Sequence, residues 1–337
     1  MWALRYLLDR GILSASEAVS AGPVAEDVSA SHRSYRVSVA GQPRWLVKRA
    51  DPVRSGGRDL GAEPALYRLS TFLPGLSDIV PECRHIEPSG QVVVLAHLPA
   101  ETFGRIVFQE GEGPADAALR SYGGTIARLH DLHPVRFGRP PWLLLALEPS
   151  WGNYRWLPPP TASFLLRLRS SSRCRTGFGK ARRAWRATSL IHGDIRWANA
   201  LVQTSGNQFD VRLVDWELAC VGDPAWDIGS ALADIIAAKA FYDTDGDLRS
   251  AFRWCELVLG GYWNVARPAE DAWRALMRRS ARLAGIRLVQ TVIEHGHESE
   301  RELRSAEAVL APWVMNMLDH ASMIGDALAA DARGAQP

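Results

Sequence analysis

The chain has 337 residues, of which 47% are hydrophobic and 23% charged, and its 13 tryptophans can fill a large core. This length allows two domains or one large bilobed domain. The formal net charge of +2 is close to neutral, which argues against a partner that is a nucleic acid or an anionic membrane. Disorder is expected only in residues 331–337.

The cysteines and the N-terminus bear on localisation. The four cysteines are scattered, with neither a CxxC pair nor the Cys/His spacing of a zinc site, which favours reduced thiols in a cytoplasmic protein. Asp9 and Arg10 interrupt the apolar N-terminal stretch too early for a secretion signal, and no apolar run is long enough for a membrane span. We therefore expect a soluble, cytoplasmic protein.

The first third of the chain is predicted to be rich in β-strands. Residues 2–8 have the pattern of a short amphipathic helix, and residues 35–49 alternate as the two strands of a hairpin. A helix is expected at 64–72 and a buried strand at 91–95. We assign residues 1–98 to a small lobe made of a β-sheet and one helix.

From residue 99 the pattern becomes helical, and we assign residues 99–330 to a large helical lobe. Apolar residues recur at helical spacing in 116–133, whereas 139–160 are rich in proline and glycine and are predicted to be loop. The remaining helices of this lobe are predicted at 224–241, 249–265, 270–295 and 303–328.

A polar loop between two apolar segments is the most informative part of the sequence. The stretch "LIHGDIRWANALV", residues 190–202, is followed by two alternating strands, 200–203 and 210–214, which form a second hairpin. Asn199 precedes the first of these strands and Asp215 follows the second. Because an antiparallel hairpin brings its two ends together, these side chains are expected to lie side by side.

Two carboxylates and an amide at one end of a hairpin would make a site of hard oxygen atoms. Asp194, Asn199 and Asp215 would supply these atoms, and Mg²⁺ prefers such ligands together with water and phosphate. Asp and Asn next to strands are more often turn formers when taken singly. The spacing H-G-D-x-x-x-x-N, followed by an apolar strand and then Asp, is a much more specific signal.

This spacing resembles the catalytic loop and metal motif of the aminoglycoside phosphotransferase and choline kinase group, relatives of the protein kinases. The similarity is carried by "HGDIRWAN", "LVDWELACVGDPAWDIG" and the upstream "TIARLHDLH". It implies an α+β, bilobed, protein-kinase-like fold with a small β-rich N-lobe and a large helical C-lobe. The catalytic loop would then span 190–203 and the metal motif 213–229.

The resemblance implies transfer of the γ-phosphate of ATP, with Mg²⁺, to an acceptor hydroxyl; GTP is an alternative donor. Asp194 would accept or orient the proton of the attacking hydroxyl. Asn199 and Asp215 would hold Mg²⁺ against the nucleotide phosphates. His192 and Asp227 are expected to brace the loop, Asp227 by bonding backbone amides at the start of the next helix.

In the small lobe the resemblance implies a lysine that contacts the α- and β-phosphates. Lys48 ends a predicted strand at the matching position, and only three of the 39 basic residues in this chain are lysines. Glu63 is its expected partner. Because the residue before a proline is pushed out of helical geometry, Pro64 favours a capping position for Glu63 over a place within the first helical turn.

Two further parts of the nucleotide site are expected from the resemblance. The loop 28–35 would cover the phosphates; it has no G-x-G-x-x-G pattern, but small residues such as Ser31 would let backbone N–H groups approach phosphate. The adenine is expected against the linker 95–98, which includes Leu95 and His97, with hydrogen bonds to backbone groups.

The acceptor is left open by the sequence. Members of the group that act on aminoglycosides or choline bind cations, which require an acidic or aromatic pocket. Residues 161–190 instead carry eight Arg or Lys and no acid. This segment is either a solvated helix face or mobile loop, or a surface for an anionic or peptide acceptor.

Three functions are therefore weighed. The first is a kinase that phosphorylates a hydroxyl of a small molecule. The second phosphorylates Ser or Thr of a ribosomally made precursor peptide, as in lanthipeptide-type biosynthesis, with a partner lyase to eliminate the phosphate. The third is a nucleotide-binding pseudokinase, suggested by the missing glycines and the Glu63–Pro64 junction.

Overall fold

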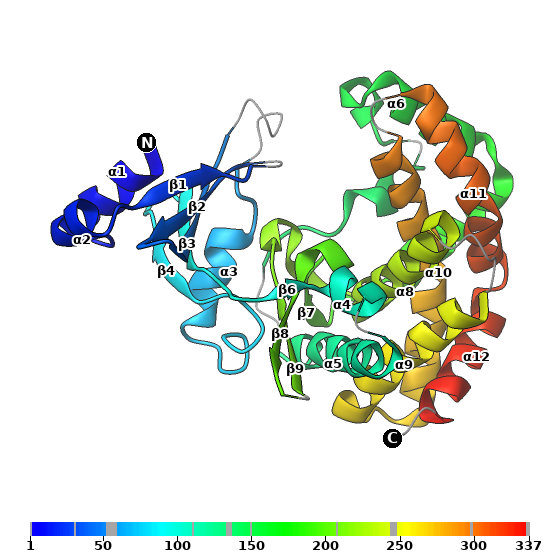
Figure 1. Ribbon diagram of the computed structural model, residues 1–337. Helices are drawn as coiled ribbons and strands as arrows, with labels where there is room; N and C mark the ends of the chain where they lie inside the picture. Colours follow the sequence, from blue (N-terminus) through cyan, green and yellow to red (C-terminus); the bar gives the residue numbers. More distant parts are fainter. Residues whose placement is uncertain are drawn as a thin grey trace. The chain divides into compact units, whose positions relative to one another are not determined.

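The computed structural model describes residues 2–29, 32–51, 59–109, 111–132, 137–148, 150–206, 208–242, 248–296 and 299–334 (Figure 1). The chain divides into two compact units. The first contains Met1–Ala100 and Arg212–Leu218, and the second contains Glu101–Val211 and Ala219–Pro337. The short segment Arg212–Leu218, assigned to the helical lobe from the sequence, thus groups with the first unit, because its backbone bonds to residues there: Leu213 N–H donates to the carbonyl of Ile79 at 2.8 Å.

The first unit is built on a five-stranded sheet of order β1-β2-β3-β5-β4, in which all neighbouring strands are antiparallel. β2 and β3 form the hairpin predicted at 35–49. β5 lies between β3 and β4, and Val92–Leu95 within it are buried. The strands are β1 (Val24–Asp27), β2 (Arg33–Val39), β3 (Gln42–Arg49), β4 (Cys83–Ile86) and β5 (Val92–Ala96).

A helix at the N-terminus covers part of this sheet. Its Ala3 and Leu7, four residues apart on one face, are buried in a core cluster with Val37 and Val94 of the sheet. The N-terminal residues therefore form a helix because it buries an apolar stripe. The helical elements of this unit are α1 (Trp2–Asp9), α2 (Ala15–Ser20), α3 (Glu63–Ser70) and the short 3₁₀ turn η4 (Trp216–Leu218).

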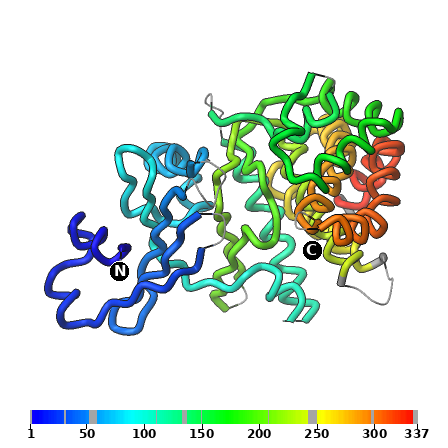
Figure 2. The backbone as a smooth tube through the Cα atoms, turned by 90° about the horizontal axis from the view of Figure 1, so that it is seen from above, coloured from blue at the N-terminus to red at the C-terminus, as the bar shows by residue number. Residues whose placement is uncertain are grey.

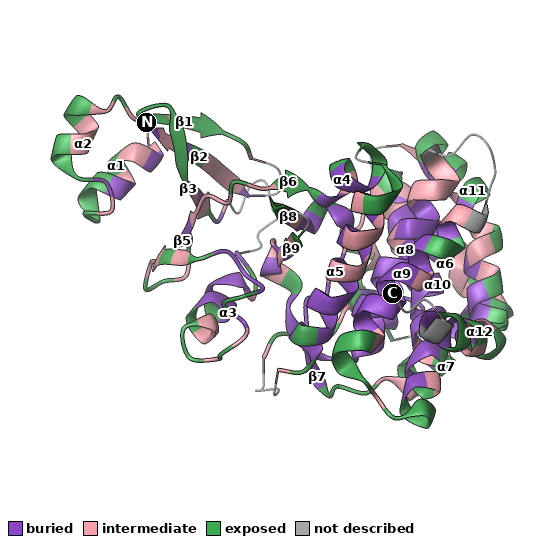
Figure 3. Cartoon of the chain, turned by 60° about the horizontal axis from the view of Figure 1, so that its bottom comes forward, coloured by how far each residue is buried: buried purple, intermediate pink, exposed green. Residues whose placement is uncertain are grey.

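The second unit is mainly helical, and α10 lies at its centre. α10 packs against α8, α11 and α12, which lie together in Figures 1 and 2, and much of its length is buried (Figure 3). No described helix is long and apolar enough to cross a bilayer. The helices are α4 (Phe103–Gln109), α5 (Glu112–His130), α6 (Pro159–Ser170), α7 (Ser172–Ala184), α8 (Pro224–Tyr242), α9 (Leu248–Ala266), α10 (Glu270–His295), α11 (Glu300–Asp319) and α12 (Ala321–Gly334).

Two glycines allow α5 and α9 to pack closely. A Cβ atom at Gly123 would lie 1.8 Å from the carbonyl oxygen of Val258, and one at Gly261 would lie 2.0 Å from that of Arg120. Neither oxygen can move away, because both belong to helix backbone. The two helices can therefore approach at this distance only with glycine at both positions.

Two elements of the second unit differ from the sequence prediction. The stretch 139–160, predicted to be loop, contains the 3₁₀ turns η1 (Trp142–Leu145) and η2 (Asn153–Trp156) and the start of α6. α6 begins at Pro159, because proline is tolerated in the first turn of a helix, where its missing N–H has no partner to lose. The single helix predicted at 303–328 is two helices, separated at His320.

Part of the predicted C-terminal tail is helical. Residues 331–334 belong to α12, so the expectation of disorder is wrong for them; residues 335–337 lie outside the described part. Leu328 and Ala332 are buried, and the indole N–H of Trp273 donates to the carbonyl oxygen of Ala329 at 3.2 Å. The last helix is therefore held by burial of its apolar face against α9 and α10.

The polar loop 192–199 is placed by short strands. β7 and β10 form an antiparallel pair, and β6, β8 and β9 form a three-stranded sheet of that order. The loop leaves the end of β7 and enters β8 through the turn η3, so its polar residues are fixed at both ends. These elements are β6 (Glu101–Thr102), β7 (Ser189–Ile191), η3 (Trp197–Asn199), β8 (Ala200–Ser205), β9 (Gln208–Leu213) and β10 (Cys220–Gly222).

Candidate active site

A buried carboxylate holds the start of the polar loop. The N–H groups of His192 and Gly193 donate to the two carboxylate oxygens of Asp227, at 2.7 and 3.0 Å. Asp227 is fully buried and also lies 3.2 Å from a ring nitrogen of His130. A buried carboxylate is stable here because hydrogen bonds satisfy both of its oxygens.

Asp227 holds the loop as expected, but through different backbone amides. Asp227 bonds the amides of the loop itself, and Asp223 is the residue that bonds an amide at the start of α8, that of Ala225 at 3.0 Å. The reason is position: α8 begins at Pro224, so Asp227 already lies within its first turn, and its side chain is directed to the loop that follows β7 and not to free helical N–H groups. His130 was part of the quoted motif, but the sequence assigned it no role.

Asp194 is held from two sides. Its carboxylate accepts a hydrogen bond from the amide nitrogen of Asn199 at 3.0 Å on one oxygen and from the guanidinium of Arg287 at 2.6 Å on the other. Gly193, just before it, has a φ of 83°, a left-handed conformation that glycine adopts without steric cost. The loop thus turns sharply and presents a carboxylate with a fixed orientation.

Asn199 is suited to binding a hard cation. Its amide nitrogen donates both to the carboxylate and to the main-chain oxygen of Asp194, each at 3.0 Å. Since both partners are acceptors, the nitrogen must face them, and the amide oxygen is turned away. Within the described residues that oxygen has no hydrogen-bond partner, so Asn199 can supply the oxygen ligand that Mg²⁺ prefers.

In the first unit, Lys48 lies between two carboxylates. Its ammonium is 2.8 Å from Glu63 and 3.0 Å from Asp215. Burial alone would lower the pKa of Lys48, but the charges and hydrogen bonds of Glu63 and Asp215 outweigh it, and the pKa is raised. Lys48 therefore carries its positive charge throughout the physiological pH range.

Glu63 lies within the first turn of α3 and not in a capping position, so that interpretation of the sequence is wrong. It is the first residue of the helix, with Pro64 next, and its side chain makes no capping hydrogen bond. Proline is tolerated in a first turn because the N–H groups there have no helical partner. The carboxylate is only 1% exposed and also accepts a hydrogen bond from the hydroxyl of Tyr67 at 3.3 Å.

The backbone around Asp215 is unusual and tightly packed. Asp215 has a φ of 66°, a left-handed conformation that is uncommon without glycine and often found at functional sites. Two residues later, the carbonyl of Glu217 accepts a hydrogen bond from the N–H of Ala62 at 3.0 Å. This bond ties the turn before α3 to the segment that carries Asp215, so the two carboxylates around Lys48 are positioned together.

The structure describes only some of the other residues that are expected to contact the nucleotide. Ser31 lies outside the described residues. Leu95 is buried within β5, and the N–H of His97 donates to the carbonyl of Arg44 at 2.9 Å. Burial and the charge of Arg36 lower the pKa of His97. In the linker 95–98, the N–H of Leu98 is without a hydrogen-bond partner in the described part of the chain.

A cavity of about 270 Å³ lies in the second unit beside the Arg287 side chain. Its walls combine aromatic, acidic and basic side chains with small residues of α8. The aromatic and charged residues that line it are Phe108, Arg196, Trp197, Asp234, Phe241, Arg287, Glu294 and His295. Because Arg287 contacts Asp194, the cavity lies next to the carboxylate that the loop presents.

The two acids of this cavity differ in their partners. Glu294 lies 3.4 Å from Arg196 and 3.5 Å from Arg287. Asp234 accepts a hydrogen bond from the N–H of Trp197 at 2.6 Å, but it forms no ion pair with a described residue. Burial raises the pKa of Asp234, against the lowering effects of this hydrogen bond and of the two arginines. The cavity thus contains one carboxylate without a direct cationic partner.

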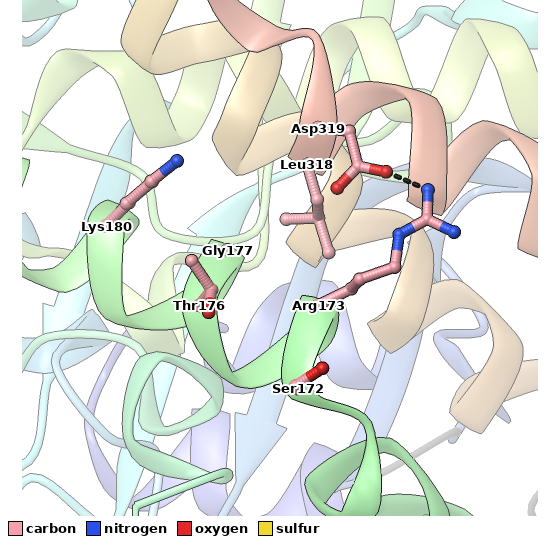
Figure 4. Close-up of a pocket in the computed structure, with 7 residues that line it drawn as sticks. All are labelled: Ser172, Arg173, Thr176, Gly177, Lys180, Leu318 and Asp319. Carbon is pink, nitrogen blue, oxygen red and sulfur yellow. Dashed lines mark hydrogen bonds and ion pairs between the residues drawn. The ribbon is translucent and has the colours of Figure 1, made fainter.

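The basic segment 161–190 forms α6 and α7, and acids from elsewhere neutralise part of its charge. Arg167 lies 2.7 Å from Glu307 of α11. Arg173 is paired with Asp319 at the end of α11, in the small pocket drawn in Figure 4. Two of the eight basic residues therefore attach α6 and α7 to α11, an option that the sequence did not suggest.

One of the comparisons with known proteins identifies a family. Residues 24–275 match the sequence profile described as the phosphotransferase enzyme family. No similar sequence is found among the curated proteins.

Solved structures with the same fold are similar over most of the chain. An ethanolamine kinase of Plasmodium vivax has 13% sequence identity and a TM-score of 0.62, over 94% of this chain and 89% of that one. An aminopropanol kinase associated with a microcompartment has 16% identity and a TM-score of 0.56, over 89% and 94%. A choline/ethanolamine kinase family protein of Mesorhizobium loti has 15% identity and a TM-score of 0.53, over 94% and 98%.

Proposed function

Because this chain belongs to the phosphotransferase enzyme family, we propose that it transfers the γ-phosphate of ATP, with Mg²⁺, to a hydroxyl group of a small molecule. The observation that carries the proposal is the Asp194 carboxylate, held by Asn199 and Arg287 next to a cavity of about 270 Å³. A fixed carboxylate beside a small-molecule cavity is the arrangement that activation of an acceptor hydroxyl requires.

The reaction can be written with these residues. The acceptor oxygen attacks the γ-phosphorus, the new O–P bond forms, and the bond to the oxygen that bridges the β- and γ-phosphates breaks, so that ADP leaves. Asp194 takes the proton of the hydroxyl. A carboxylate has about four acceptor positions, so the bonds from Asn199 and Arg287 leave positions for this proton.

The phosphates of ATP would be bound by charge. Lys48, oriented by Glu63, supplies a compact ammonium for the phosphates. Asn199 and Asp215 have the oxygen atoms that suit Mg²⁺ and are the residues that would hold it. When bound, Mg²⁺ supplies positive charge that offsets the charge of the phosphates.

The cavity favours an acceptor that is small and carries an ammonium group. Asp234 provides a carboxylate without an ion pair in the described part of the chain, and Phe108, Trp197 and Phe241 provide aromatic walls, which attract cations. The names of two similar structures contain ethanolamine and aminopropanol, which are amino alcohols. We therefore include a small amino alcohol in the proposal as the acceptor class.

The alternative functions have less support. The peptide-kinase hypothesis was based on the basic segment, and Arg167 and Arg173 of that segment are paired with acids of α11. The pseudokinase hypothesis was based in part on Glu63 and Pro64, yet Glu63 reaches Lys48 at 2.8 Å. Both remain as outcomes of the experiment below.

The test is acceptor-dependent formation of ADP, with mass spectrometry of the products. The purified protein is incubated with Mg²⁺ and ATP and with separate pools of amino alcohols, neutral polyols, hydroxy acids and Ser/Thr-containing peptides. We expect one phosphate to be added to an amino alcohol, and Asp194→Asn serves as the inactive control. Phosphate on peptides alone would favour the peptide kinase, and nucleotide binding without transfer to any pool would favour the pseudokinase.

A further inference from the structure

Arg287 is a buried cation that no motif in the sequence identifies. It lies on α10, its side chain is 4% exposed, and it lines the cavity next to Asp194. Taking a guanidinium out of water is costly unless carboxylates and hydrogen bonds compensate it. Arg287 has such partners in Asp194 at 2.6 Å and Glu294 at 3.5 Å.

We propose that Arg287 is a positioning residue that fixes the orientation of the Asp194 carboxylate towards the acceptor. This inference rests on the proposed function, in which Asp194 takes the proton of the acceptor hydroxyl. The bond to Arg287 is short and charge-assisted, a class about twice as strong as a neutral hydrogen bond. Asn199 binds the other carboxylate oxygen, so the two donors together prevent rotation of the carboxylate.

The position of Arg287 is itself fixed by its own helix. Glu294 lies seven residues later, on the same face of α10, because seven residues complete about two helical turns. The carboxylate of Glu294 also accepts a hydrogen bond from Gln290 at 2.9 Å and lies 3.4 Å from Arg196. A chain of contacts thus runs from Arg196 through Glu294 and Arg287 to Asp194, and its first three members line the cavity.

Orientation matters for the rate. Misplacement of a reacting group by about 1 Å is enough to cost roughly a hundredfold in rate. Without Arg287, one oxygen of Asp194 would lose its donor, and the carboxylate would be free to turn about the bond to Asn199. We therefore expect Arg287 to act on kcat and to have little effect on the binding of ATP.

The test uses Arg287→Ala and Arg287→Lys with the acceptor found above. We expect kcat of Arg287→Ala to fall about a hundredfold, with the KM for ATP changed less than about threefold, and Arg287→Lys to lie between this variant and the wild type. Added guanidinium ion, far below unfolding concentrations, should restore at least about a tenth of the lost kcat in Arg287→Ala. A role in folding alone would not produce this rescue.

The matched control is Arg279→Ala. Arg279 is on the same helix and pairs with a buried carboxylate, Asp223, at 2.9 Å, but it does not line the cavity or contact Asp194. We expect this variant to lose thermal stability, to retain kcat at temperatures where it is folded, and to show no response to guanidinium.

The outcomes separate the two proposals. If the wild type phosphorylates no acceptor, the proposed function fails. If the wild type is active and Arg287→Ala keeps its kcat, the positioning role fails and the proposed function stands. The positioning role would also be overturned if Arg287→Ala lost kcat, added guanidinium did not restore it, and Arg287→Met kept the kcat of the wild type. Only the volume of the side chain would then matter.

Discussion

The charged clusters of the two units are arranged in opposite ways. In the first unit a cation, Lys48, is held by two carboxylates, Glu63 and Asp215. In the second unit a carboxylate, Asp194, is held by a cation and an amide, Arg287 and Asn199. In each case the central group is the one that the proposed reaction uses on its substrate, and the surrounding groups have the charge or polarity that fixes it.

One rule accounts for both clusters. A functional charge that must keep one orientation in a partly dry site is surrounded by at least two partners, because a single hydrogen bond still allows rotation. The partners also offset the cost of removing the charge from water. Changing a central group should therefore affect catalysis most, and changing a partner should affect orientation or stability.

The largest expected effect is at the centre of the second cluster. Asp194→Asn keeps the size of the side chain and one acceptor oxygen, but the second oxygen becomes an NH₂ group, and the side chain no longer takes a proton. We expect kcat to fall by about 10²–10⁴-fold, while the affinity for ATP, measured by calorimetry, stays nearly unchanged. A variant with wild-type turnover would contradict the assignment of Asp194.

The centre of the first cluster should show a mixed effect. Lys48→Met removes the cation and leaves the carboxylate of Glu63 buried without it. Removing one partner of a buried ion pair costs about 3–5 kcal/mol of stability. Because the pKa of Lys48 is raised on folding, the stabilising charge is fully present at neutral pH and is lost only when the pH rises through that pKa. We expect weak ATP binding together with a lower melting temperature.

The double variant Lys48→Met/Glu63→Gln sharpens this prediction. It leaves no unpaired charge between the two side chains, so stability should partly return, while ATP binding should not. Recovery of both would mean that Lys48 serves the fold and not the nucleotide.

A smaller effect is expected at Asp234, the cavity carboxylate outside both clusters. Asp234→Asn should raise the KM for an amino alcohol about tenfold, which corresponds to about 1.4 kcal/mol of binding free energy, without changing the KM for ATP. Because burial raises the pKa of Asp234, the ionised form is lost as the pH falls through a value above that of an ordinary carboxyl group. The wild-type KM for the acceptor should therefore rise on acidification, and the KM of Asp234→Asn should not follow it.

The melting temperature of Asp234→Asn is the control for this prediction. A raised carboxyl pKa means that ionised Asp234 destabilises the folded state at pH values above it. Asp234→Asn should then melt no lower than the wild type at neutral pH. A clearly lower melting temperature would show that Asp234 has a structural task that the cavity does not explain.

The smallest effect is expected outside both clusters, at Arg173 of the basic segment. Its side chain is largely exposed, and pairs of this kind contribute about 0–1 kcal/mol. Arg173→Ala should leave kcat and both KM values unchanged and shift the melting temperature by a few degrees at most. A raised KM for the acceptor would show that α7 takes part in acceptor binding.

The sequence predicted the parts of these clusters that are set by local spacing. Asp194 and Asn199 are five residues apart on one loop, and their contact follows from the short turn between β7 and β8. Lys48 was identified by its position at the end of a predicted strand, and the rarity of lysine, with three of 39 basic residues, strengthened the assignment. Its contact with Glu63 was expected, but the place of Glu63 in the first helical turn was not.

Contacts between distant segments escaped the sequence analysis. Arg287 lies 93 residues from Asp194, on a helix with several other arginines, so nothing in its pattern marks it. The α11 acids that pair with Arg167 and Arg173 likewise lie more than 130 residues away from these arginines. Side-chain pairing between helices depends on how they pack, and periodicity alone does not specify which residues meet.

The turn before α3 has a consequence for protein engineering. Gly61 has a φ of 57°, and a Cβ atom there would lie 2.2 Å from the carbonyl oxygen of Glu217. Any larger residue would push apart the two segments that carry Glu63 and Asp215. A mutant library intended to change the nucleotide preference should therefore keep Gly61 constant, since a substitution there would disturb the surroundings of Lys48 from a position that bears no functional group.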